Sequence, residues 1–162
     1  MSGNAYLDGL KMLARRDLSE QQVRQRLVRK GHDEEAIDDA IAQLREEHAI
    51  DDARMAETIA RTAATVKRRG KLRARLEIER AGIGRDTAAR AVNDVFETID
   101  TDALIEASLR IRLRGRSTID DDREFQRLYR YLTDQGFEDD RIMRALTARL
   151  KHTEIPRGHR DD

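Results

Sequence analysis

The basic side chains are the residues of this sequence that are best suited to bind a charged partner. Between Arg54 and Arg85 there are ten lysines and arginines against three acids, although the whole chain of 162 residues has a formal net charge of zero. The densest part is the stretch 67–83, KRRGKLRARLEIERAGI. Guanidinium and ammonium groups bind carboxylates and phosphates through charge and hydrogen bonds. The sequence therefore predicts a strongly positive middle region, suited to an acidic protein surface or to phosphates.

Two leucines lie within this basic stretch. On a helical wheel of about 100° per residue, Leu72 and Leu76 fall on a different side from the core residues Ala74 and Ile78. An apolar centre with a basic rim suits recognition of an acidic protein. Two interpretations stay open: the leucines form an exposed contact surface, or they pack on an adjoining unit and the cations are its solvated edge. The flanking cations are Lys71, Arg73, Arg75 and Arg80.

Other kinds of site are not indicated by the sequence. The segment 82–84, Gly-Ile-Gly, lies between two predicted helices and lacks the lysine and hydroxyl of a phosphate loop. Adjacent acids such as Asp38 and Asp39 point about 100° apart on a helix, so they do not pair for acid–base catalysis. No aromatic residue is interleaved with the basic stretch, which disfavours base stacking. The four histidines lack metal-ligand spacing, namely His32, His48, His152 and His159. We therefore expect no enzyme, no catalytic residue, no cofactor and no metal site.

Composition indicates the kind of fold that positions these residues. The chain is 38% hydrophobic, 40% charged and 4% aromatic, which predicts a thin, extended core in place of one large one. Charges of both signs alternate along apolar patterns of helical period, so we predict an all-α protein. The absence of cysteine excludes disulfides and thiolate metal sites. The first ten residues lack the features of a leader, and no apolar run could span a membrane, so a cytoplasmic protein is expected.

An internal repeat divides the chain. Aligning Gly31, Gly82 and Gly136 brings apolar residues into register before and after each glycine, apart from His32. Each glycine is expected to adopt a left-handed C-terminal cap. The helices that complete the second and third units are predicted over 51–68 and 102–114. We predict three tandem three-helix units stacked in an elongated, curved array, over 5–51, 52–100 and 101–151, followed by a flexible tail, 152–162.

Three segments resemble the three repeats of the RecX family, which regulates the bacterial recombinase RecA. They are LARRDLSEQQVRQRLVRKG, DDARMAETIARTAATVKRRG followed by LRARLEIERAGI, and REFQRLYRYLTDQGF. The resemblance covers residues 10–150. It implies a non-enzymatic protein that lies in the groove of the RecA filament on single-stranded DNA and inhibits ATP hydrolysis, strand exchange and coprotease activity. The glycine-basic motif of the family falls on Gly70, Arg73, Arg75 and Gly82.

We therefore predict a monomer that binds the RecA filament through basic residues of its first and middle units. Whether it blocks closure around the nucleotide or caps the growing filament end stays open. An alternative is a direct DNA-binding module, possibly dimeric, that uses the helix pair 20–44, although the acids of its second helix would repel DNA. An inert scaffold is a third possibility. The predicted binding residues are Arg24, Arg26, Arg29, Lys30, Arg68, Arg69, Lys71, Leu72, Arg73, Arg75 and Leu76.

Overall fold

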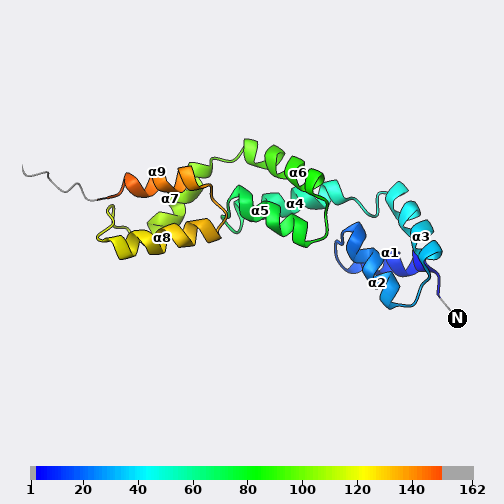
Figure 1. Ribbon diagram of the computed structural model, residues 1–162. Helices are drawn as coiled ribbons and strands as arrows, with labels where there is room; N and C mark the ends of the chain where they lie inside the picture. The colour runs from blue at the N-terminus through cyan, green and yellow to red at the C-terminus, as the bar shows by residue number, and fades with distance from the viewer. Residues whose placement is uncertain (1–2, 151–162) are drawn as a thin grey trace, which may run out of the picture.

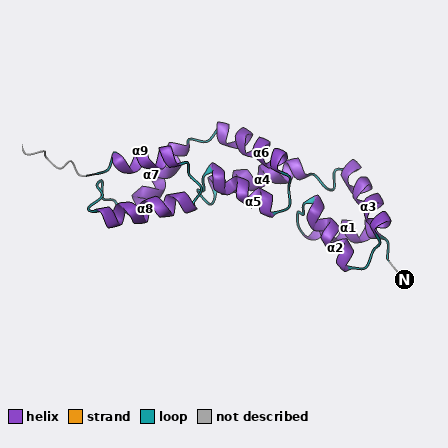
Figure 2. Ribbon diagram, viewed as in Figure 1, coloured by secondary structure: helices purple, strands orange, loops and turns teal. Residues whose placement is uncertain are grey.

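The computed structural model describes residues 3–150, which form an elongated row of helices (Figure 1). Within these residues there are nine α-helices and no strand beyond one isolated bridge between Ile119 and Leu150 (Figure 2). The predicted all-α, helical-repeat fold is confirmed. The predicted tail, 152–162, lies outside the described residues. The helices are α1 (Ala5–Arg15), α2 (Glu20–Arg29), α3 (Glu34–Glu46), α4 (Asp52–Thr65), α5 (Lys71–Arg80), α6 (Arg85–Glu97), α7 (Thr101–Arg112), α8 (Asp122–Asp134) and α9 (Asp139–Thr147).

Each group of three consecutive helices encloses its own hydrophobic cluster, and we call these groups the first, middle and third repeats. Leu27, Ile41 and Leu44 are buried in the first repeat. The middle repeat packs four alanines of α4 against α5 and α6, because small side chains let the helix axes approach closely. Phe137 is the largest fully buried side chain and belongs to the third repeat. Three small cores in a row explain how so charged a chain folds.

The helix ends follow local sequence signals. Ser19 and Gln22 form a capping box at the start of α2, and the Asp33 carboxylate accepts a hydrogen bond from the Ala36 N–H at 2.8 Å. Two predicted ends were wrong, because α4 stops at Thr65 and α7 at Arg112. The chain leaves each helix through an arginine in the left-handed region, Arg68 (φ 53°) or Arg114 (φ 51°), which ends the helical hydrogen-bond pattern. The glycines aligned by the repeat, Gly31, Gly82 and Gly136, have φ of 89°, 87° and 90°.

The repeats join through the ends of their second helices. At the first junction, the Ser19 Oγ at the start of α2 donates to the Ala81 carbonyl at the end of α5, at 2.5 Å. At the second junction, the N–H groups of Gly70 and Leu72 at the start of α5 donate to the carbonyls of Gln135 and Gly136 after α8, at 2.8 and 3.0 Å. The C-terminus of α2 and the N-terminus of α8 therefore point away from the middle repeat, toward opposite ends of the row (Figure 1).

The second junction requires glycine on both sides. Gly70 occupies the position that Ser19 holds in the first repeat, 51 residues earlier. A Cβ atom on Gly70 would lie 2.4 Å from the Gly136 carbonyl oxygen, and one on Gly136 would lie 2.2 Å from the Arg73 backbone nitrogen. Since neither distance leaves room for a side chain, two backbones meet directly here.

Candidate partner-binding site

A groove between α1 and α2 collects the most basic surface of the first repeat. Its cations come from both helices at spacings of three or four residues, which places them on the facing sides of each helix. Asp8 and Met12 also line it. We call this surface the first-repeat groove, and its cations are Lys11, Arg15, Arg16, Arg26, Arg29 and Lys30.

Most of these cations have no counter-charge within residues 3–150. Only Lys30 forms an ion pair there, with Asp8 at 3.7 Å. Asp8 is itself occupied, because His32 Nε2 lies 2.7 Å from its Oδ2 and Lys30 lies near its other oxygen. The hydrogen bond from His32 is the main cause that lowers the pKa of Asp8, which keeps the carboxylate ionised. Lys11 also interacts with Asp8 and helps to lower its pKa, so the four arginines around the hollow stay available to an anionic partner.

The basic stretch of the middle repeat is arranged differently. Glu77, whose side chain is only 15% exposed, forms an ion pair with Arg69. Its carboxylate oxygens also lie 3.7 Å from Arg73 Nε and 3.9 Å from Lys67 Nζ. Arg75 pairs with Glu79 at 3.3 Å. These cations are therefore less available to a partner, because each already lies beside a carboxylate of the same chain.

Arg73 lies in a place that the helical wheel did not anticipate. The wheel put it beside the leucines, either as the rim of a contact surface or as a solvated edge, and the structure packs its side chain against the end of α8. Its Nη1 donates to the Asp134 carbonyl at 3.4 Å, and its Nε is buried without a hydrogen-bond partner. Arg73 is thus a junction residue as well as a neighbour of the leucines, and its role in partner binding stays a prediction. The wheel describes one helix alone, so it could not include a neighbouring repeat.

Leu72 and Leu76 are both exposed, with 55% and 39% of their surface accessible. The structure therefore supports the first of the two interpretations, in which the leucines form an exposed patch on α5. The remaining predicted residues are scattered. Arg24 pairs with Asp38 at 2.6 Å, Lys71 lines a hollow with Glu138 and Arg141 at the second junction, and Arg68 is exposed in the turn before α5.

Comparison with known proteins places this geometry in a family. The model of the first three-helix domain of RecX matches residues 5–44, which contain the first-repeat groove. The regulatory protein RecX of Halorhodospira halophila is 30% identical over 140 residues, covering 86% of this chain and 84% of that relative. This chain belongs to the RecX family. The regulatory protein RecX of Syntrophotalea carbinolica is 29% identical over 135 residues, covering 83% of this chain and 88% of the relative.

Comparison with a solved structure extends the match from the first repeat to all three repeats. The crystal structure of RecX from Lactobacillus salivarius superposes with a TM-score of 0.74 at 24% identity, covering 88% of this chain and 92% of that one. At this identity the likeness concerns the fold alone. The order and packing of all three repeats are therefore those of a RecX protein.

Sequence reasoning missed half of the groove in this RecX chain. It selected Arg26, Arg29 and Lys30 on α2 but not the cations on α1, which are Lys11, Arg15 and Arg16. A signal was present, because Arg15, Arg26 and Arg29 have no acid three or four residues away within their own helices. The search for dense charge favoured the middle stretch, where acids at that spacing neutralise the arginines.

Other site types find no support in the part of the chain that is described. Residues 3–150 contain no group of three or more histidine and acidic side chains placed to hold a metal ion. None of their helices is long and apolar enough to cross a membrane. His32 is buried and fills the slot that Ile83 and Phe137 occupy in the other repeats, with Asp8 as its polar partner.

Proposed function

We propose that this RecX-family chain binds the RecA filament on single-stranded DNA and inhibits its ATP hydrolysis, strand exchange and coprotease activity. The observation that carries the proposal is the first-repeat groove, in which four arginines without an ion pair in residues 3–150 meet in a chain that is neutral overall. Such a groove attracts an acidic protein surface or phosphates. The protein acts by binding, without a catalytic residue, a metal or a cofactor.

The elongated shape supports a filament as the partner. The groove lies in the first repeat, and the exposed leucines lie on α5 of the middle repeat, so two different contact surfaces are separated along the row (Figure 1). A filament offers the same surface at regular intervals, and two linked contacts bind more tightly than either alone. Bridging of neighbouring recombinase subunits would restrain the movements that ATP hydrolysis needs.

The test is the single-stranded-DNA-dependent ATPase rate of the cognate RecA recombinase, titrated with this protein. Loss of activity at far less than one molecule per recombinase subunit would indicate capping of filament ends. Loss only near saturation would indicate occupancy along the filament. An ATPase rate that never changes, measured with correctly folded protein, would contradict the proposal.

Direct DNA binding is the second candidate, and the free cations of the groove favour it. The sequence suggested α3 as the helix that enters the DNA groove, but this form of DNA binding is disfavoured. Helix α3 presents exposed acids at Glu34, Glu35 and Asp39, which would repel phosphates. Its Asp38 already pairs with Arg24. Binding to an oligonucleotide without recombinase would weaken steeply with salt if phosphates dominate. Strong salt-dependent DNA binding with no effect on the ATPase would make this candidate the function.

A further inference from the structure

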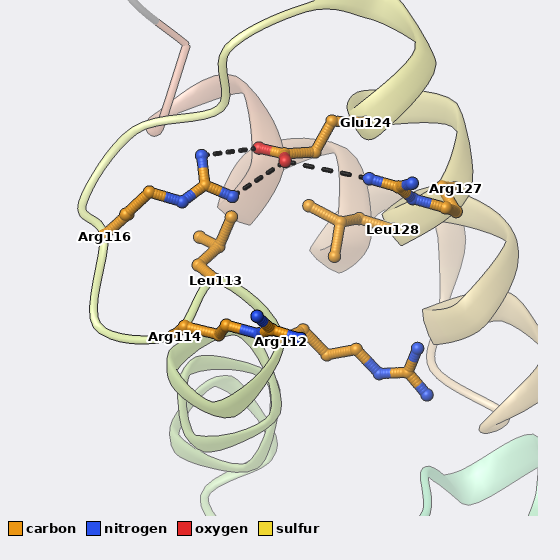
Figure 3. A pocket seen from close by; sticks show the side chains of 7 residues that line it. All are labelled: Arg112, Leu113, Arg114, Arg116, Glu124, Arg127 and Leu128. Carbon is orange, nitrogen blue, oxygen red and sulfur yellow. Dashed lines mark hydrogen bonds and ion pairs between the residues drawn. The ribbon is translucent and has the colours of Figure 1, made fainter.

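A second basic hollow lies at the opposite end of the row, between the end of α7 and the start of α8 (Figure 3). Leu113 and Leu128 form its apolar floor, and both are buried. Four arginines and one acid surround the floor, namely Arg112, Arg114, Arg116, Arg127 and Glu124. We call this surface the third-repeat hollow. None of its residues was selected from the sequence as a binding residue.

Two of these arginines are held in place by contacts within the repeat. Arg116 Nη2 lies 2.8 Å from Glu124 Oε2, and its Nη1 lies 2.7 Å from Asp120 Oδ2. The Arg112 guanidinium stacks on the ring of Tyr131, 3.4 Å from its centroid. A stacked or paired guanidinium loses less conformational freedom when it binds a ligand, so it is prepared for one.

The other two arginines have weaker contacts, or none, with acidic side chains of the repeat. Arg127 reaches Glu124 only at 3.8 Å, and its side chain is 70% exposed. Arg114 has no ion pair within residues 3–150, although it lies at the rim of the hollow. Figure 3 shows Arg116 and Arg127 reaching Glu124 from opposite sides, with Arg112 and Arg114 below them at the end of α7. Glu124 already pairs with Arg116 and lies near Arg127, and the Arg112 guanidinium is turned away from Glu124, so Arg114 and the exposed Arg127 have the most donors left for a further anion (Figure 3).

We propose that the third-repeat hollow is a phosphate-binding site. A guanidinium matches the oxygens of a phosphate with two parallel hydrogen bonds, and a tetrahedral phosphate can accept from more than one arginine at once. The apolar floor strengthens the attraction by lowering the local dielectric constant. This site is separate from the first-repeat groove, and it does not depend on recombinase binding.

The site is tested by nuclear magnetic resonance of the arginine side chains, with inorganic phosphate, pyrophosphate and a short oligo-dT as probes. We expect the Nε–Hε signals of Arg112, Arg114 and Arg127 to shift with phosphate and pyrophosphate. The double variant Arg114→Gln and Arg127→Gln should weaken binding at this site at least about tenfold. A matched control, Arg85→Gln with Arg144→Gln, removes the same charge from exposed residues outside the hollow and should change binding less than about twofold.

The probes also identify the source of the phosphate. If oligo-dT shifts the same signals, and the double variant reduces the salt slope of its binding by about 1.4, the site binds nucleic-acid backbone. If only free phosphate and pyrophosphate bind, it is a site for small phosphates. No shift at these arginines with any probe would overturn the proposal, as would equal losses in the two double variants or a stronger shift with a glutamate peptide. Because no recombinase is present, failure here leaves the proposed function untouched.

Discussion

The basic stretch of the middle repeat and the first-repeat groove contain the same kinds of side chain, but the fold uses them differently. In the middle repeat, Lys67, Arg69 and Arg73 surround the largely buried Glu77. In the groove, Asp8 interacts with Lys11 and Lys30, and the other four cations have no ion pair within the described residues. The density of charge in a sequence therefore does not measure the charge that a partner can use. What matters is how many cations remain after the fold has paired its own.

The largest effect is expected from reversing charge in the groove. The double variant Arg26→Glu and Arg29→Glu should weaken inhibition of the recombinase ATPase by about a hundredfold, because two attractive contacts become repulsive. The free energy of unfolding should fall by less than about 2 kcal/mol, because neither arginine has an ion pair within residues 3–150 but both lie in the last turn of α2, where cations favour the helix dipole. The control, Arg85→Glu with Arg144→Glu, makes the same charge change elsewhere. Equal loss of inhibition in both double variants would show that net charge matters and the groove does not.

The next expected effect is a loss of stability in the middle repeat when Glu77 is replaced. Glu77→Gln leaves Lys67, Arg69 and Arg73 close together without their shared carboxylate, so the free energy of unfolding should fall by about 2 kcal/mol. Chemical denaturation followed by circular dichroism measures this change. The comparison variant Glu79→Gln removes an acid that pairs only with the exposed Arg75 and should cost less than about 1 kcal/mol. If the two variants unfold alike, Glu77 does not organise the stretch.

The sequence predicted much of the fold because its signals are local. The glycines at 31, 82 and 136 are left-handed as predicted, and the capping box at Ser19 and the cap at Asp33 likewise depend on only a few neighbouring residues. The site was harder to predict. Arg73 depends on Asp134, 61 residues away, and the groove depends on how α1 lies against α2. Contacts between elements decide which cations are free, and no single helical pattern contains them.

A smaller effect is expected from the exposed leucines of the middle repeat. The double variant Leu72→Ser and Leu76→Ser should weaken inhibition by about tenfold if they form an apolar contact with the recombinase. The free energy of unfolding should change by less than about 0.5 kcal/mol, because both side chains are exposed. Inhibition equal to that of the unaltered protein would leave the groove as the principal contact surface.

The smallest effect concerns acid stability in the first repeat. The folded state lowers the pKa of Asp8, chiefly through His32, so this carboxylate stabilises the fold above its unfolded pKa. That contribution is lost as the pH falls through the lowered folded pKa. Asp8→Asn should therefore flatten the acid limb of a plot of unfolding free energy against pH. An unchanged acid limb would show that the contact with His32 adds no stability.

The two junctions between repeats differ in how they can deform. The first uses side-chain groups, since the buried Ser19 hydroxyl donates to the Ala81 carbonyl and the Asp52 carboxylate accepts from the Glu20 N–H at 3.0 Å. The second joins backbone to backbone at Gly70 and Gly136, where no side chain can turn and a hydrogen bond breaks only if a whole helix moves. A side chain can adjust its rotamer when two repeats shift, whereas a backbone contact cannot, so we expect the molecule to bend more easily between its first and middle repeats than between its middle and third. Such bending would change the direction of the basic groove relative to the other two repeats.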